Sequence, residues 1–400
     1  MRQVIQSARS GKLTLKEVPD PKVRRGQILV RTRASLISPG TERTVVKFAK
    51  KNLVSKAKER PDLVRKVLEK TKRDGLTSTL NSVMARLDEP IPLGYSACGE
   101  VMALGEGCEG KFKVGQRIAI AGAGVANHAE YNVVLPNLSA AVPDDVLDEE
   151  ACFGTLGAIA LHAIRNLKLQ IGDFAAVIGA GLIGQLAVRL LELSGVRAAV
   201  FDYDTSRLVL SQKGHAEFAW NLSEGIPAEA IMEISNGRGC DGVLVAAATD
   251  SSEPFELAGK IARDRAKICL VGMVGTNFPY REFMQKELSL VVSRSYGPGR
   301  YDQEYENRGI KYPVGYVPWT QTRNLEEIMR RMSPTNDRPL VVKSLISHRF
   351  PFDKAGDAYN MIMKNTEPNL GVVLNYNQNK ENTNSRLSIQ KPISIKSKQN

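Results

Sequence analysis

Three glycines and one carboxylate are the first residues whose types and spacing could do chemistry. Gly179, Gly181 and Gly184 follow an apolar run and open a helical pattern, and Asp202 ends the next apolar run. In this order the glycines allow a tight turn, close approach of the backbone to a pyrophosphate, and close packing of helix on strand. The amides at the helix start then face the phosphate charge. The pattern predicts a dinucleotide site; the alternative is a glycine-rich turn without a ligand.

The helix and strand patterns around this motif predict the frame that positions it. Apolar runs over 174–178 and 196–201 flank the helical pattern, and helices and strands then alternate up to residue 293. Such alternation is typical of an α/β, doubly wound parallel sheet with helices on both faces. The other predicted coenzyme residues stand at the helix start or after later strands: Leu182, Ile183, Ala247, Gly272 and Met273.

Asp202 also bears on which dinucleotide is bound. A carboxylate at this position accepts hydrogen bonds from the ribose of NAD(H) and disfavours the 2′-phosphate of NADP. Arg207 follows in the next predicted helix and could soften that rejection. NAD is therefore the predicted coenzyme, with NADP as the open alternative.

Composition and charge exclude several other classes of function. Ten of the twelve excess positive charges fall in residues 41–90 and 376–400, which argues against a general nucleic-acid face. No apolar stretch reaches the length of a membrane span, and the first residues lack a signal-peptide core, so we expect a cytoplasmic protein. The five cysteines form no CxxC pair and the four histidines no HxH or HExxH pattern, so local motifs predict no metal site.

Two segments interrupt the regular pattern. Residues 41–89 are basic and helical, and predict either a lid, partner surface or anion-binding face, or a solvated insertion packed on the body. Residues 295–323 gather Tyr301, Tyr305, Tyr312 and Trp319 among charges and glycines. Aromatic hydroxyls suit a sugar-like or ring-bearing ligand, and we assign these four to the substrate. The alternative is an aromatic cluster packed over the surface.

Several sequence blocks carry a resemblance to a known family. LGYSACGEVMALGEG, KVGQRIAI and HAEYNVV, then GDFAAVIGAGLIGQLAVRLL, and finally FPFDKAGDAYNMIM resemble the medium-chain dehydrogenase/reductase superfamily, the alcohol-dehydrogenase-like group. The resemblance implies a GroES-like, β-rich catalytic domain over 1–150 with the insertion 41–89, and a Rossmann domain over 151–300. It further implies a return to the catalytic domain over 301–376 and homo-oligomers. The polar end, 377–400, is predicted to be disordered.

SPGTER, LGYS and YGPGRYD resemble a narrower branch, the front half of bi-domain oxidoreductases from surface-polysaccharide gene clusters. Zinc-dependent relatives place a cysteine, a GHE motif and a third ligand around the active site. By this resemblance Ser38 replaces the cysteine, Tyr95 and Ser96 replace His and Glu, and Thr155 takes the third position beside the coenzyme. Hydroxyls are poor Zn²⁺ ligands, so we expect no zinc.

Without a metal, hydroxyl donors must polarise a substrate carbonyl. The resemblance places Ser38, Thr41 and Tyr95 at the active site, with Tyr95 as first candidate for proton donor or oxyanion partner. The alternative is that Tyr95 only fills the former metal site. His128 is a weaker catalytic candidate, and Glu42 either pairs with Arg43 or binds a substrate hydroxyl.

These observations predict a zinc-independent, NAD(H)-dependent oxidoreductase for a hydroxylated small molecule, sugar-like or a sugar nucleotide. One alternative is reduction of an enone or quinone within the same fold. A second is a coenzyme-bound scaffold without catalysis, which holds an acidic partner with its basic insertion. No nucleic-acid or membrane partner is expected.

Overall fold

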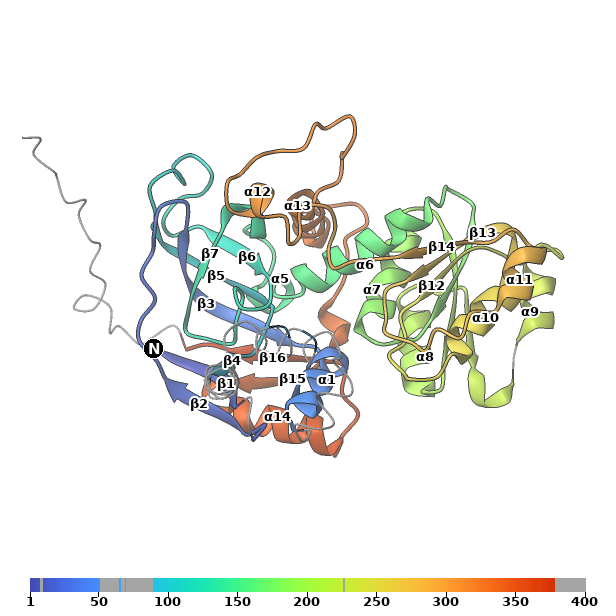
Figure 1. Ribbon diagram of the computed structural model, residues 1–400, viewed down its shortest axis with the longest axis horizontal. Helices are drawn as coiled ribbons and strands as arrows, with labels where there is room; N and C mark the ends of the chain where they lie inside the picture. The colour runs from blue at the N-terminus through green and yellow to red at the C-terminus, as the bar shows by residue number, and fades with distance from the viewer. Residues whose placement is uncertain (8–9, 51–64, 66–68, 70–88, 226, 378–400) are drawn as a thin grey trace, which may run out of the picture.

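The computed structural model describes residues 1–7, 10–50, 65, 69, 89–225 and 227–377. Most of the basic insertion 41–89 and nearly all of the tail predicted to be disordered therefore lie outside the described residues. The described chain forms two lobes, with blue, cyan, orange and red segments in one and mainly green to yellow segments in the other (Figure 1). Within these residues, no helix is long and apolar enough to cross a membrane.

The first lobe is built on two sheets that use both ends of the chain. Strands β2, β1 and β4 form one sheet, and β15, β16, β3, β5, β6 and β8 follow one another in the second, where β7 also pairs with β3. β16 runs antiparallel to β3, so the returning chain completes this sheet (Figure 1). The strands are β1 Arg2–Ser7, β2 Leu13–Glu17, β3 Ile28–Ile37, β4 Pro90–Pro92, β5 Ser96–Leu104, β6 Arg117–Ala121, β7 Tyr131–Val134, β8 Ser139–Ala141, β15 Ile346–Pro351 and β16 Gly371–Asn375.

Short helices cover this lobe and close its turns. α14 packs against β2 and β15, and its buried face joins residues of β3 and β16 in one apolar cluster. The helices are α1 Pro39–Lys50, η1 Pro136–Leu138, α5 Asp148–Ala151, η3 Lys343–Leu345, η4 Phe352–Lys354 and α14 Ala355–Lys364. α1 begins directly after β3, so Ser38 and Thr41 stand at the end of a buried strand.

The second lobe is a six-stranded sheet in the order β11-β10-β9-β12-β13-β14. All its neighbouring strands pair in parallel, as the alternating sequence pattern predicts. β9 is buried along its whole length because helices cover both faces of the sheet. The strands are β9 Phe174–Ile178, β10 Arg197–Asp202, β11 Phe218–Asn221, β12 Cys240–Val245, β13 Ala262–Leu270 and β14 Ser289–Val292. The helices are α7 Leu182–Leu193, α8 Thr205–Lys213, η2 Leu222–Glu224, α9 Ala228–Ile234, α10 Glu253–Ile261 and α11 Tyr280–Gln285.

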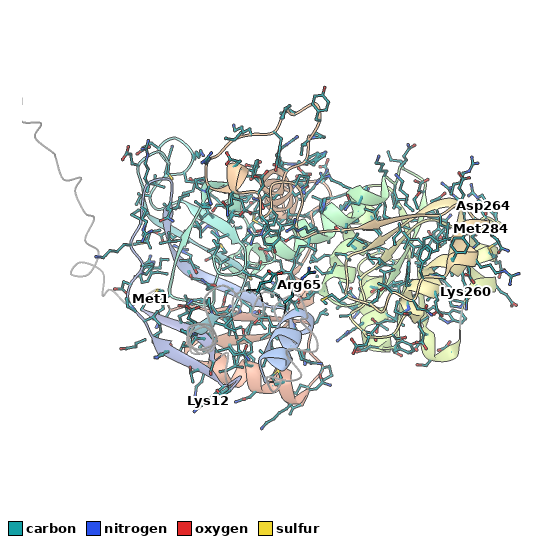
Figure 2. All side chains as sticks on the ribbon, in the orientation of Figure 1. Met1, Lys12, Arg65, Lys260, Asp264 and Met284 are labelled. Atoms are coloured by element: carbon teal, nitrogen blue, oxygen red, sulfur yellow. The ribbon has the colours of Figure 1, made fainter. Side chains whose placement is uncertain are left out.

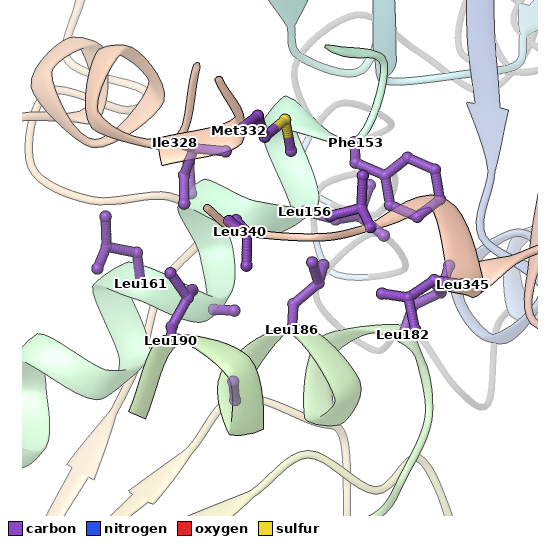
Figure 3. Packing of buried hydrophobic residues seen from close by; sticks show 14 of the residues in the cluster. Phe153, Leu156, Leu161, Leu182, Leu186, Leu190, Ile328, Met332, Leu340 and Leu345 are labelled. Atoms are coloured by element: carbon purple, nitrogen blue, oxygen red, sulfur yellow. The ribbon is translucent and has the colours of Figure 1, made fainter. Parts of the chain in front are cut away.

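The two lobes share one apolar core around helix α6, Gly154–Leu167. α6 packs against α7 of the second lobe, against β5 and β6 of the first, and against α13, Gln321–Met332. Figure 3 shows Leu156 and Leu161 of α6 beside Leu186 and Leu190 of α7, with Ile328 above them. The short helix α12, Gln303–Glu306, lies beside η1. This continuous core fixes the position of the glycine turn relative to the first lobe, the predicted catalytic domain.

Candidate active site and coenzyme site

The glycine turn has the geometry that a bound pyrophosphate requires. Gly179 has φ +102°, and a Cβ there would lie 2.7 Å from the Ala247 nitrogen. At Gly184 a Cβ would lie 1.9 Å from the Gly179 carbonyl oxygen, which only glycine avoids. At Gly181, the residue before α7, a Cβ would meet nothing within 4 Å. The first and third glycines are thus required by the fold, and the second leaves open space at the helix start.

Asp202 closes this turn from the end of β10. Its Oδ2 accepts the Ala180 N–H at 2.6 Å and its Oδ1 accepts the Asp204 N–H at 2.9 Å. The carboxylate retains further lone pairs for ribose hydroxyls. Arg207 lies in the first turn of α8, where its Nε is 3.4 Å from Asp204 Oδ2. The structure therefore places Asp202 at the glycine turn and Arg207 in the helix that follows β10.

The remaining predicted coenzyme residues line the carboxyl ends of the neighbouring strands. A Cβ on Gly272 would lie 1.9 Å from the Ala247 carbonyl oxygen, so the segments after β12 and β13 are in close contact. Met273 is exposed, whereas Leu182 is buried in the shared core. Leu182 and the half-buried Ile183 can consequently offer a phosphate only their backbone amides.

The three predicted catalytic hydroxyls come together. The Tyr95 hydroxyl interacts by hydrogen bonds with the side chains of Thr41 and Ser38. Burial raises the pKa of Tyr95 to about 12, the nearby Glu42 carboxylate adds to that rise, and the two hydroxyls oppose it. The Tyr95 carbonyl accepts the Gly122 N–H at 2.9 Å and the Thr155 hydroxyl at 3.2 Å. Thr155 thus fixes the backbone of Tyr95.

The zinc that this fold family often carries has no suitable donors at these positions. Ser96 Oγ donates to the Cys152 carbonyl at 2.6 Å and also lies 3.3 Å from the Thr155 nitrogen, so it serves the backbone. Burial holds the pKa of the Cys152 thiol well above 9.0, which disfavours the thiolate that zinc requires. Among the described residues, no group of three His, Cys, Asp or Glu could hold a metal ion. The residues here do not fit Zn²⁺.

Sequence reasoning missed a buried polar chain next to the hydroxyls. His128 Nε2 lies 3.2 Å from Glu42 Oε1, and Tyr359 donates its hydroxyl proton to Glu42 Oε2. His128 Nδ1 lies 2.7 Å from Ser35 Oγ, which is 3.0 Å from the Tyr376 hydroxyl. These five residues come from five separate segments, so no spacing in the sequence could have linked them.

The structure bears on one of the two alternatives for Glu42, its pairing with Arg43. Arg43 Nη2 donates to Asn365 Oδ1 at 3.0 Å. Glu42 is 3 % exposed and engages His128 and Tyr359. A carboxylate so deeply buried is stable only with such partners. The other alternative, that Glu42 binds a substrate hydroxyl, stays a prediction.

The four aromatic residues predicted to bind substrate are engaged with their own surroundings. Arg294 and Arg300 place their guanidinium groups 4.5 and 4.1 Å from the Tyr301 ring centre. Tyr305 and Tyr312 stack at 5.2 Å between ring centres. These contacts fit an aromatic cluster packed over the surface.

Trp319, the fourth of these aromatics, lies between the guanidinium groups of Arg165 and Arg323, at 3.5 and 4.2 Å from its ring centre. The same segment nevertheless reaches the hydroxyl site through another residue, Tyr296. A Cβ on Gly122, whose N–H holds Tyr95, would lie 3.4 Å from the Tyr296 hydroxyl oxygen. Tyr296, not the four predicted aromatics, is thus the tyrosine of this segment that the described contacts place by the hydroxyl site. The substrate assignment of the four stays a prediction.

Known proteins with the same organisation are dehydrogenases. The chain is 26 % identical over 284 residues to a sorbitol dehydrogenase of Bacillus subtilis, which covers 63 % of this chain and 77 % of that relative. It is 25 % identical over 281 residues to galactitol 1-phosphate 5-dehydrogenase of Escherichia coli, with 68 % and 69 % covered. The chain is thus similar in sequence to dehydrogenases and reductases of small polyols and sugars. No family model matches the chain.

Solved structures confirm the predicted fold class. An alcohol dehydrogenase from Thermus sp. ATN1 superposes with a TM-score of 0.70 at 18 % identity, covering 94 % of this chain and 100 % of that one. Galactitol-1-phosphate dehydrogenase from Escherichia coli gives 0.69 at 20 % identity, covering 94 % and 99 %. The GroES-like lobe and the Rossmann lobe are therefore shared with these enzymes.

Proposed function

We propose that this chain is a zinc-independent, NAD(H)-dependent dehydrogenase or reductase for a hydroxylated, sugar-like small molecule. One observation carries the proposal: Tyr95, Ser38 and Thr41 form a hydroxyl cluster. By the resemblance, Ser38 and Tyr95 of this cluster stand where zinc-dependent relatives have metal ligands. Hydroxyl donors aimed at a carbonyl oxygen can stabilise the charge that develops there.

The glycine turn supports NAD(H) as the coenzyme. Gly181 leaves room for the pyrophosphate, the N-terminus of α7 supplies amides to it, and Asp202 accepts from the ribose. When bound, NAD(H) supplies or accepts the hydride. The protein's own residues then need only hold the substrate oxygen and handle its proton.

Tyr95 is the residue that we assign to the substrate oxygen. Its hydroxyl stays protonated at neutral pH because its pKa is raised to about 12, so it donates a hydrogen bond rather than repelling an oxyanion. Ser38 and Thr41 orient it. The proposed substrate class follows from the relatives, which are named for sorbitol, galactitol 1-phosphate and xylulose.

The test combines metal analysis, coenzyme titration and a substrate screen. We expect less than stoichiometric zinc in the purified full chain, tighter binding of NADH than NADPH, and turnover of a polyol or keto-sugar. Stoichiometric zinc that supports activity would contradict zinc independence. Turnover of enones alone would replace the substrate class, and coenzyme binding with no turnover of either class would favour a scaffold.

A further inference from the structure

A continuous buried chain of hydrogen bonds runs through the catalytic lobe. It joins Glu42 of α1 to His128 before β7, then to Ser35 of β3, and then to Tyr376 after β16. Glu42 and His128 are 3 % and 0 % exposed, so water does not screen or replace these contacts. Because each link is within hydrogen-bond distance, protons can exchange along the whole chain.

The chemistry of the acceptors fixes the direction of the hydrogen bonds. An ionised Glu42 carboxylate only accepts, so His128 must carry its proton on Nε2 and Tyr359 must donate. His128 Nδ1 is then an acceptor, and the nearby Ser35 hydroxyl donates to it. Ser35 Oγ in turn accepts from Tyr376. Burial raises the pKa of Tyr376, so its hydroxyl remains a donor. Every hydrogen bond between Tyr376 and Glu42 therefore has its donor on the Tyr376 side and its acceptor on the Glu42 side.

The two ends of this series of hydrogen bonds lie at different places in the lobe. At one end, Glu42 interacts electrostatically with the Tyr95 hydroxyl, and Thr41, which precedes Glu42, hydrogen-bonds that hydroxyl. At the other end, Tyr376 lines a cavity of about 860 Å³ whose wall also includes Arg2 and Asp353. Asp353 is exposed, so water has access to this cavity.

We propose that Glu42, His128, Ser35 and Tyr376 form a path that carries protons between the surface cavity and Tyr95. This inference rests on the proposed function, because reduction of a carbonyl consumes one proton and oxidation of an alcohol releases one. In reduction, the substrate oxygen takes the Tyr95 proton. The His128 Nε2 proton moves to the ionised Glu42 carboxylate and from there to Tyr95, so Glu42 ends ionised as it began. The Ser35 proton passes to His128 Nδ1, the Tyr376 proton to Ser35, and a cavity water restores Tyr376. Oxidation runs the same transfers in reverse.

Substitution of Ser35 tests the path with little change to its ends. Ser35→Ala removes the link between His128 and Tyr376 but leaves the contact of His128 with Glu42. Ser139→Ala is the matched control, because this buried hydroxyl of the same sheet donates only to the Leu135 carbonyl. With the best substrate of the screen, we expect Ser35→Ala to lower kcat about 10- to 100-fold. The ratio of kcat in H₂O to that in D₂O should rise, with KM and NADH affinity unchanged.

A lower kcat with an unchanged isotope ratio, or an unchanged kcat, would overturn the path. A second readout needs neither substrate nor coenzyme: ¹⁵N-histidine NMR of the full chain. We expect one buried histidine as the Nε2–H tautomer, whose Nδ1 signal shifts in Ser35→Ala and not in Ser139→Ala. The Nδ1–H tautomer, or no shift, would contradict the proposed polarity. Failure of the substrate screen alone would leave this spectrum intact, so the two proposals fail separately.

Discussion

Replacement of Gly181 by alanine separates coenzyme binding from folding. Gly181 has φ −70° and ψ −175°, an extended conformation that alanine adopts without strain. The added Cβ would meet no atom of the protein within 4 Å. The fold should therefore tolerate the methyl group, at a cost of about 1 kcal/mol for alanine as the residue preceding a helix. That same open space is where the proposed pyrophosphate approaches the backbone.

The expected loss of affinity follows from the hydrogen bonds at stake. A backbone amide that donates to a charged phosphate contributes about 1.5–3 kcal/mol, so losing one such contact weakens binding about 10- to 100-fold. Gly184→Ala gives the opposite result, since its Cβ would lie 1.9 Å from the Gly179 carbonyl oxygen. That variant should lose stability before binding can be compared.

NADH fluorescence titration and thermal unfolding measure the two effects. Gly356→Ala is the control, because a Cβ there also meets nothing within 4 Å and the residue lies in α14 of the other lobe. We expect Gly181→Ala to melt within a few degrees of wild type and to bind NADH at least about tenfold more weakly, with Gly356→Ala unchanged in binding. Wild-type affinity in Gly181→Ala would refute the placement of the pyrophosphate.

Two further predictions concern the hydroxyl site and assembly. Because its pKa is raised to about 12, Tyr95 stays protonated from pH 6 to 10. Its hydroxyl should produce no alkaline limb in a rate profile over this range, and Tyr95→Phe should lower kcat/KM about 10²- to 10⁴-fold. An alkaline limb in the wild-type pH–rate profile that disappears in Tyr95→Phe would contradict this prediction. The edge strand β14 exposes Leu290 and Val292. Met284 of α11 is also exposed and lies at the outer end of the lobe (Figure 2). Such an edge can pair with a second copy, so Val292→Arg should shift a dimer toward monomer in light scattering; an unchanged mass refutes this interface.

The Rossmann lobe could be predicted from the sequence because its signals are local. The strand, glycine turn, helix and Asp202 are contiguous, and the structure bears out the steric roles of Gly179 and Gly184. The all-parallel sheet likewise follows from alternating patterns of helix and strand. Local patterns could not give the pairing of β16 with β3, which joins residues more than 300 positions apart. That pairing was expected only from the resemblance.

The candidate site was predicted only in part. Ser38, Thr41 and Tyr95 were named together by resemblance, and the structure places their hydroxyls in contact. The Glu42–His128 contact was missed because a buried acid and a buried histidine look like ordinary surface residues in a sequence. Their burial is decided by packing between α1, α14 and β3, which no single segment reveals.

The raised pKa of Tyr95 bears on how the site replaces a proton that Tyr95 gives away. A phenol with a pKa of about 12 is a good hydrogen-bond donor to an oxyanion, but its phenolate is too basic to persist at neutral pH. Any proton that Tyr95 gives to a substrate must therefore be replaced at once from a neighbour. Glu42 is the nearby acid, and it is buried against His128 and Tyr359. Under the proposed function, the buried hydrogen bonds that run from Glu42 to Tyr376 are positioned to supply that proton.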